Sequence, residues 1–250
     1  MAKRARVTIA TQPVTIVCFG DSNTFGQSAD SDERLPYLDR WTTHLARLLG
    51  ANANIIPEGL NGRTTVHDDP IDAAFVGVGG DNLNGRRYLL PCLHSHKPVD
   101  AVVLALGCND LKTRFSLNAD EVCRGLQLLV ADVRQSGAGP GGGAPRITVV
   151  SPPACKETAD NKQWGFAGCA AKSRAVIEAY RDYCAVDGLD FVDLSQAAPV
   201  GSDGIHFSAK ASLPIAKAVA KKVVRRLSPE IQRSLNPPSL LEKAVEAMLE

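Results

Sequence analysis

Residues 101–106 read AVVLAL, a continuous apolar run that follows Asp100. A strand with one solvent-exposed face alternates apolar and polar side chains, so an unbroken run indicates a strand buried on both faces, as in a parallel sheet. Further runs of apolar and β-branched residues stand at 14–19, 53–57, 146–150 and 189–192. The sequence therefore predicts a mainly parallel sheet of five strands.

Segments with helical periodicity alternate with these strands. Apolar residues recur at steps of three and four between Leu38 and Leu49, before Gly50, and again at 122–133, 176–184 and 208–227. Asn118 and Glu121 form a capping-box pattern ahead of the second of these helices. Strands that alternate with helices of this length are typical of right-handed βαβ units. We therefore expect an α/β fold, a three-layer α/β/α sandwich.

Composition and charge exclude several classes of protein. The chain has 250 residues, of which 44% are hydrophobic and 22% charged, which excludes a disordered, collagenous or disulfide-stapled chain. The formal net charge is +1, so no overall field draws the protein to nucleic acid or to an anionic membrane. No apolar run reaches the roughly 18 residues that span a bilayer. We expect neither a nucleic-acid partner nor a membrane partner.

The seven cysteines are odd in number and show neither a CxxC pair nor zinc-finger spacing. This pattern indicates free thiols in a reducing compartment, so we predict a cytoplasmic protein without a disulfide framework. His67, Asp68 and Asp69 are adjacent in sequence rather than spaced along one face of an element. We therefore predict no metal site there, and no cofactor.

The chain divides into three segments. Residues 14–227 carry the alternating pattern, residues 1–13 form a short basic tail, and residues 228–250 form an appendage interrupted by prolines. The SLLE sequence at 239–242 is a capping-box pattern for a short helix with an apolar stripe, made of Leu241, Val245 and Met248. That stripe must be buried against the main body or a second copy, and we expect a homo-oligomer.

Chemically active residue types follow the predicted strands. Ligands of open α/β sheets bind beyond the carboxyl ends of the strands. The segments at those ends are GDSN (20–23), GLNG (59–62) and GCND (107–110), and DGIH (203–206) precedes the last helix. A serine, exposed glycine amides, an asparagine and an Asp/His pair are the parts needed for acyl transfer through a serine nucleophile.

These four segments, in this order, resemble the four sequence blocks of the SGNH (GDSL-type) hydrolases. A closer similarity to bacterial arylesterases and acyltransferases of that family includes RW (40–41), EGL (58–60), RTT (63–65), DDP (68–70), LNG (83–85) and YL (88–89). The resemblance spans residues 14–227. It implies the SGNH (flavodoxin-like) sandwich and a cofactor-free serine esterase for short-chain aryl or alkyl esters, with acyl transfer to alcohols as a second activity.

The resemblance also implies roles for individual residues. Ser22 would be the nucleophile, His206 the general base and later the acid, and Asp203 the residue that orients His206. The oxyanion hole would consist of the backbone N–H groups of Ser22 and Gly62 and the side-chain amide of Asn109. Taken alone, Ser22 could be a helix N-cap and His206 a buried core histidine, but their combination with Asp203 favours catalysis.

Further residues of the quoted segments are expected to border a pocket for a small ester, with walls from segments 27–39 and 66–87. They are Asp21, Trp41, Asn61, Cys108 and Ile205. A thioesterase or lysophospholipase, or a carbohydrate acetylesterase, is the alternative within the same fold, although only 5% aromatic residues make a sugar-stacking platform less favourable. A non-catalytic binding module is the alternative of another class, and the complete catalytic set argues against it.

Overall fold

The structure is a computed structural model that describes residues 13–31, 33–79, 81–227, 232 and 235. Its centre is a five-stranded sheet of order β2-β1-β3-β4-β5 in which every neighbouring pair is parallel. The predicted strands are all present, and their bounds are β1 Val14–Gly20, β2 Ala53–Gly59, β3 Ala101–Ala105, β4 Arg146–Val150 and β5 Asp190–Val192. The predicted fold class is confirmed.

The central strands are apolar on both faces because each face meets a layer of helices. Along β1, Val17 and Phe19 point into one hydrophobic cluster, whereas Ile16 and Cys18 point into the other. Successive side chains of a strand face opposite sides, so two buried faces require an unbroken apolar run. All seven cysteines are buried free thiols.

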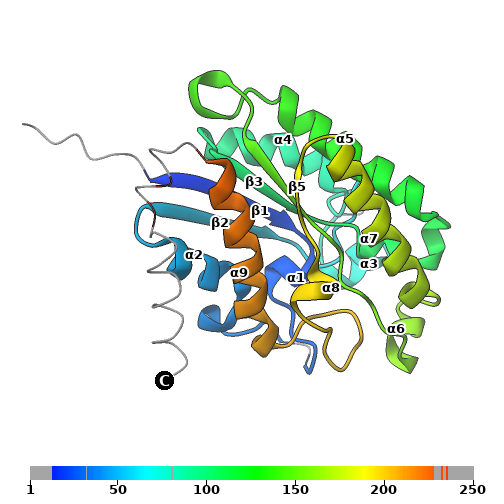
Figure 1. Cartoon of the computed structure of the whole chain (residues 1–250). Helices are drawn as coiled ribbons and strands as arrows, with labels where there is room; N and C mark the ends of the chain where they lie inside the picture. Colours follow the sequence, from blue (N-terminus) through cyan, green and yellow to red (C-terminus); the bar gives the residue numbers. More distant parts are fainter. Residues whose placement is uncertain (1–12, 32, 80, 228–231, 233–234, 236–250) are drawn as a thin grey trace, which may run out of the picture.

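Helices cover both faces of the sheet (Figure 1). Helices α2 (Trp41–Leu49) and α9 (Ala209–Arg226) pack on one face, and α4 (Gly85–His96), α5 (Ala119–Gln135) and α7 (Cys169–Val186) on the other. The predicted capping box of α5 is present, because the Asn118 side chain accepts from the Glu121 amide at 2.9 Å and Glu121 accepts from the Asn118 amide.

One prediction about α2 was wrong. Leu38 was placed on the apolar stripe of that helix, but it lies in the 3₁₀ turn η1 (Tyr37–Asp39) and is 53% exposed. Arg40 separates the two elements because its backbone is extended, with φ −80° and ψ 140°. The helix therefore begins at Trp41, and only the later part of the predicted stripe is buried.

Several elements were missed. They are α1 (Ser22–Phe25), α3 (Pro70–Val76), α4, α6 (Ala159–Gln163), α8 (Leu194–Ala197) and the 3₁₀ turns η2 (Asn109–Leu111), η3 (Thr113–Phe115) and η4 (Pro140–Gly142). Pro91 lies inside α4, where a proline usually indicates the end of a helix. Helix α3 exposes Ile71 and Phe75. Neither helix therefore shows a clear amphipathic pattern in the sequence.

Residues 1–12 of the predicted tail at 1–13, and the helix proposed to begin near Ser239, lie outside the described residues. Of the appendage, the structure describes Gln232 and Leu235, and Leu235 is buried in the cluster between α2, α9 and the sheet. Among the described helices, none is both long and apolar enough to cross a membrane.

Candidate active site

Ser22 stands in a tight turn directly after β1. Asp21 is the N-cap of α1, and its carboxylate accepts from the Asn23 amide at 2.9 Å. The end of β2 packs closely against this turn. A Cβ atom added at Gly59 would lie only 2.1 Å from the backbone nitrogen of Phe25. A side chain at 59 would displace α1, so glycine there lets the turn that carries Ser22 pack directly on the sheet.

The turn lies where the strand order reverses. After β1 the chain moves outward to β2, then crosses back so that β3 pairs with the opposite edge of β1. Ligands of open α/β sheets bind at the carboxyl ends of the strands where the order reverses. Ser22 follows β1 and Asn109 follows β3, so both predicted residues stand at that end of the sheet.

Ser22, His206 and Asp203 form a hydrogen-bonded chain. The Nε2 atom of His206 lies 2.8 Å from Ser22 Oγ, and its Nδ1 atom lies 2.6 Å from Asp203 Oδ2. The side chains of His206 and Asp203 are 14% and 11% exposed. The structure thus brings together the three predicted residues in the arrangement of a serine, a base and its orienting carboxylate.

The Asp203 carboxylate is fixed at both oxygens. Oδ1 accepts from the backbone amides of Ile205 and His206, each at 2.8 Å, while Oδ2 faces the imidazole. Burial tends to raise the pKa of Asp203, but the hydrogen bonds and charge of His206 and the two amides outweigh it and lower the pKa below its usual value. Asp203 is therefore ionised at neutral pH and selects the His206 tautomer with hydrogen on Nδ1.

Asn23 is a positioning residue that the sequence analysis did not single out. Its Oδ1 accepts from the Phe207 amide at 3.2 Å, and its Nδ2 donates to the Ile205 carbonyl at 3.4 Å. It thereby fastens both neighbours of His206 to the residue next to Ser22. No local sequence pattern predicts these two hydrogen bonds, because the residues that they join are more than 180 positions apart in sequence.

The predicted oxyanion-hole residues are joined through the turn after β2. Arg63 donates from Nη1 to the Gly20 carbonyl at 3.0 Å, and its own carbonyl accepts from Asn109 Nδ2 at 3.1 Å. The Leu60 amide donates to the same Gly20 carbonyl at 3.2 Å. Gly62 lies within this turn at φ +80°, a conformation that favours glycine. The turn therefore bridges the carboxyl ends of β1 and β3.

The residues predicted to border the pocket lie in different parts of the structure. Asn61 donates from Nδ2 to Gln27 Oε1 at 2.9 Å, so it contacts the predicted wall segment 27–39. Cys108 and Ile205 require a correction, because they are 1% and 2% exposed and their side chains pack in the core on the α5 and α7 side. Cys108 instead shares a hydrogen bond with the Cys155 thiol.

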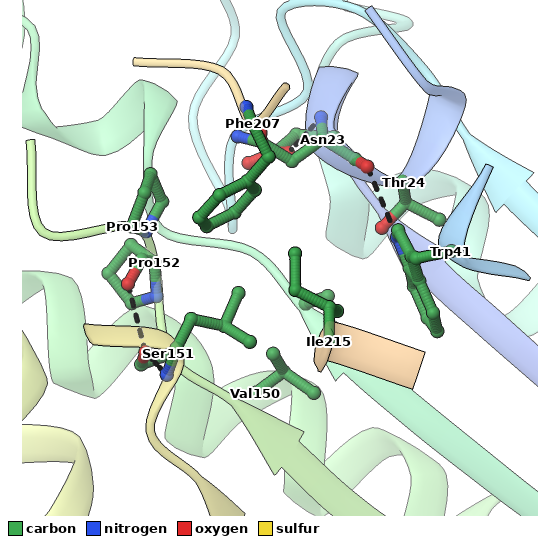
Figure 2. A pocket seen from close by; sticks show the side chains of 12 residues that line it. Asn23, Thr24, Trp41, Val150, Ser151, Pro152, Pro153, Phe207 and Ile215 are labelled. Atoms are coloured by element: carbon green, nitrogen blue, oxygen red, sulfur yellow. Dashed lines mark hydrogen bonds between the residues drawn. The ribbon is translucent and has the colours of Figure 1, made fainter. Parts of the chain in front are cut away.

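Asp21 and Trp41 line a small cavity beside the turn that carries Ser22. Figure 2 shows Trp41 with other lining residues of this cavity. The indole nitrogen of Trp41 donates to the Asn23 carbonyl at 3.1 Å, and the Phe207 ring closes another side. The cavity volume is about 20 Å³, room for roughly one water molecule and too small for an ester. Asp21 and Trp41 therefore support the turn rather than enclose a substrate.

A larger hollow lies at the opposite end of the sheet. It has a volume of about 580 Å³ and is lined by residues at the starts of β3, β4 and β5, among them Asp100, Arg146 and Leu189. Ser22 and Asn109 follow the other ends of their strands. The hollow therefore lies away from Ser22 and Asn109.

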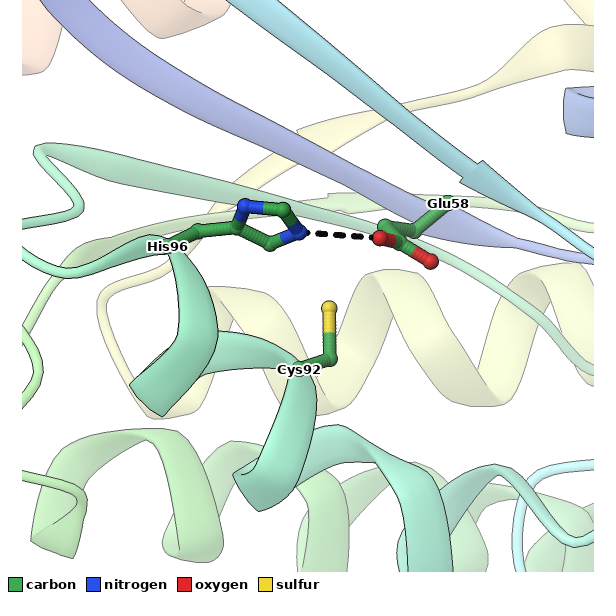
Figure 3. Close-up of side chains that lie close together, drawn as sticks. All are labelled: Glu58, Cys92 and His96. Carbon is green, nitrogen blue, oxygen red and sulfur yellow. Dashed lines mark hydrogen bonds and ion pairs between the residues drawn. The ribbon is translucent and has the colours of Figure 1, made fainter.

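Glu58, Cys92 and His96 are the one group among the described residues whose ligand atoms are close enough to surround a metal ion (Figure 3). His96 Nε2 lies 3.0 Å from Glu58 Oε1, and Glu58 also accepts from the Cys92 thiol. Burial, and then the charge of Glu58, raises the pKa of Cys92 to about 12, so the thiol stays protonated. The positive charge of the Arg63 guanidinium acts in the opposite direction on the pKa of Cys92, and the charge of Glu58 acts to raise the pKa of Arg63. These contacts describe a hydrogen-bonded cluster that fastens α4 to β2.

The adjacent His67, Asp68 and Asp69 have separate partners. Asp68 accepts from Asn84 and Arg87, Asp69 accepts from Arg114, and the His67 ring packs against Phe115. Their side chains thus hold together the loop that precedes α3 and α4.

Asp21 gives the fold a specific pH dependence. Burial raises its pKa to about 6, although the Asn23 amide and the nearby His206 oppose the shift. In the unfolded chain the Asp21 carboxyl has a pKa of about 3.9. Between pH 4 and 6 the folded protein therefore binds this proton more tightly than the unfolded chain does. The free energy of unfolding consequently falls as the pH rises through this range. The Asp21→Asn variant lacks this titration. We expect its free energy of unfolding, relative to wild type, to rise by about 2 kcal/mol from pH 4 to pH 7.

Urea unfolding of both proteins at pH 4, 5, 6 and 7 measures this difference. Asp182→Asn, the same change at an exposed position on α7, is the matched control and should leave the pH dependence unchanged. Parallel pH profiles for wild type and Asp21→Asn would show that Asp21 titrates alike in the folded and unfolded chain.

The profile of the GDSL-like Lipase/Acylhydrolase family matches residues 18–212. No curated protein sequence matches the chain significantly.

Solved structures resemble the whole fold. A carbohydrate acetylesterase family member from Sinorhizobium meliloti is 34% identical, with a TM-score of 0.77 over 88% of this chain and 99% of that one. The aryl esterase of M. smegmatis is 35% identical, with a TM-score of 0.76 over 86% of this chain and 100% of that one. The chain therefore belongs to the GDSL-like lipase/acylhydrolase family and is a serine ester hydrolase.

Proposed function

We propose that the protein hydrolyses small carboxylic esters through an acyl-enzyme on Ser22. The observation that carries this proposal is the contact of 2.8 Å between Ser22 Oγ and His206 Nε2, with Asp203 bound to the other ring nitrogen. His206 Nε2 accepts the hydroxyl proton while Oγ attacks the carbonyl carbon of the ester. Asp203 stabilises the imidazolium that forms.

The negative charge that develops on the carbonyl oxygen needs hydrogen-bond donors. In our proposal these are the backbone N–H groups of Ser22 and Gly62 and the Nδ2–H of Asn109. The tetrahedral intermediate collapses as His206 gives its proton to the departing alcohol. A water molecule then attacks the acyl-enzyme as His206 accepts one of its protons. His206 returns that proton to Ser22 Oγ as the acid leaves, which restores the hydroxyl and the neutral imidazole. An alcohol in place of water would give acyl transfer by the same steps.

We propose short acyl chains on aryl or alkyl alcohols as the substrate class. The similarity to the M. smegmatis aryl esterase, over nearly the whole length of both chains, supports this choice. An acetylated carbohydrate is the second candidate, supported by the similarity to the S. meliloti carbohydrate acetylesterase family member. Both candidates need the same catalytic residues and differ in the alcohol.

Chain-length dependence tests the substrate class. Purified protein is assayed at pH 8 with p-nitrophenyl esters of two, four, eight and twelve carbons. We expect kcat/KM to be highest for acetate and butyrate and to fall at least about tenfold by twelve carbons, because a short-chain site loses binding when the chain outgrows it. A long-chain optimum would instead indicate a thioesterase or lysophospholipase.

Acetylated sugars form the second arm of the experiment, with acetate release as the measurement. A kcat/KM for peracetylated xylose above that for p-nitrophenyl acetate would favour the carbohydrate candidate. Labelling by a fluorophosphonate probe tests the alternative of a binding module, because labelling requires a working Ser–His pair.

A further inference from the structure

Lys112 is buried in the protein interior next to the predicted oxyanion hole. It is 2% exposed and lies three residues after Asn109, at the end of η2. Its Nζ donates to Asn109 Oδ1 at 2.7 Å and to Asp72 Oδ2, and lies 3.8 Å from Asp69 Oδ2. Lysines are almost never fully buried unless their charge is paired. Here the partners are two carboxylates at the start of α3 and one neutral amide.

The contacts of Asn109 define how its amide group is turned. The ammonium of Lys112 has no acceptor capacity, so it must face the amide oxygen. On the nitrogen side, Nδ2 donates one hydrogen to the Arg63 carbonyl at 3.1 Å. A second Nδ2–H remains, and among the described residues no hydrogen bond uses it. That hydrogen is the donor that the proposed oxyanion hole requires.

We infer that Lys112 is a positioning residue for ester hydrolysis, fixing the Asn109 side chain and strengthening its remaining N–H as an oxyanion donor. This inference rests on the proposed function. A cation on the amide oxygen draws electron density away from the NH₂ group, and linked hydrogen bonds polarise one another most in a desolvated site. The effect is small in the ground state and grows as negative charge develops on the substrate oxygen.

The surrounding charges hold Lys112 in place and balance it. Arg114 Nη1 lies 2.8 Å from both Asp69 Oδ1 and Asp72 Oδ1, so two cations and two carboxylates form one network. Burial works to raise the pKa of Asp72, but Lys112 and Arg114 together lower it below its usual value. The ring of Phe166 covers Nζ at 5.3 Å. The two carboxylates at the start of α3 thereby hold the Lys112 ammonium against the Asn109 amide oxygen.

Steady-state kinetics of Lys112→Met test this role. We expect kcat for a short-chain ester to fall about 10- to 100-fold while KM changes less than about threefold, since the contact strengthens mainly in the transition state. Lys172→Met is the matched control. Lys172 Nζ reaches the carbonyls of Asp110 and Leu111 in the same turn, at 3.4 and 3.3 Å, without contacting the Asn109 side chain. It should keep kcat within about threefold.

A double-mutant cycle with Asn109→Ala separates positioning from general destabilisation. Once Asn109 is absent, Lys112→Met should cost less than about threefold further, because its effect passes through that side chain. Equal losses in both backgrounds, or an unchanged kcat in Lys112→Met, would overturn the inference. If Lys112→Met does not fold, the charge-balanced Lys112→Met/Asp72→Asn variant, compared with Asp72→Asn alone, carries the same test.

The outcome can be told apart from a failure of the proposed function. If the wild type hydrolyses no ester and takes up no fluorophosphonate, the function itself is wrong. If the wild type is active and Asn109→Ala retains full activity, the assignment of Asn109 fails and the inference with it. If Asn109→Ala loses activity and Lys112→Met does not, only the role of Lys112 is wrong.

Discussion

Replacing Ser22 by alanine should lower kcat for p-nitrophenyl acetate by about 10⁴- to 10⁶-fold, since no acyl-enzyme can form without the hydroxyl oxygen. In the structure, the Oγ atom is the group that contacts His206 Nε2, at 2.8 Å. An alanine leaves the imidazole without a proton to accept. The turn itself should persist, because its cap is the Asp21 carboxylate.

The measurement is a comparison of kcat and of fluorophosphonate labelling for wild type and Ser22→Ala. Ser195→Ala, at an exposed serine in α8, is the matched control and should keep both. Thermal unfolding of each variant shows whether the fold is retained. Full activity in Ser22→Ala with an intact fold would place the nucleophile elsewhere and overturn the mechanism.

The sheet could be predicted because its signals are local. The strand at 101–105 is recognisable by its unbroken apolar run, and helix α5 by the Asn118–Glu121 cap followed by a buried stripe. Helix α4 escaped prediction because Pro91 lies within it. A single internal proline is tolerated there, since the packing of the helix on the sheet outweighs the lost hydrogen bond.

The candidate site, like the fold, could be predicted only where its residues stand in local sequence motifs. Ser22, Asp203 and His206 were predictable because they stand in short motifs at strand ends and before the last helix. Asn23 was not, because its contact with Phe207 joins residues far apart in sequence. Lys112 lies only three residues from Asn109, but its burial depends on pairing with Asp72, which is distant in sequence. The prediction that Cys108 borders the pocket failed for a related reason. Adjacency to Asn109 in sequence does not say which way a side chain points, and the thiol points into the core.

The turn that carries Ser22 is supported by contacts from several elements. The turn is capped by Asp21, pressed by β2 through Gly59 and tied by Asn23 to the segment that carries His206. Rigid support of this kind keeps Ser22 Oγ within reach of His206 without substrate. Preorganised contacts reduce the rearrangement required in the transition state.

Replacing Asp203 by asparagine should lower kcat by about 10⁴-fold, although asparagine has nearly the same shape. The amides of Ile205 and His206 both donate to Oδ1, so in the variant the amide oxygen must stay there to accept them. The NH₂ group of the asparagine then faces His206 Nδ1. It donates to that nitrogen and favours the tautomer with hydrogen on Nε2, which cannot accept the Ser22 proton.

Kinetics across pH 5–9 and the NMR signal of the His206 ring hydrogens measure this change. We expect activity to be lost over the whole range, because the wrong tautomer is uncharged and no pH restores the acceptor on Nε2. Asp160→Asn, an exposed aspartate in α6, provides the control with unchanged kcat. If Asp203→Asn keeps more than about a tenth of wild-type kcat, then orientation by shape is sufficient and the charge of Asp203 contributes little to the base.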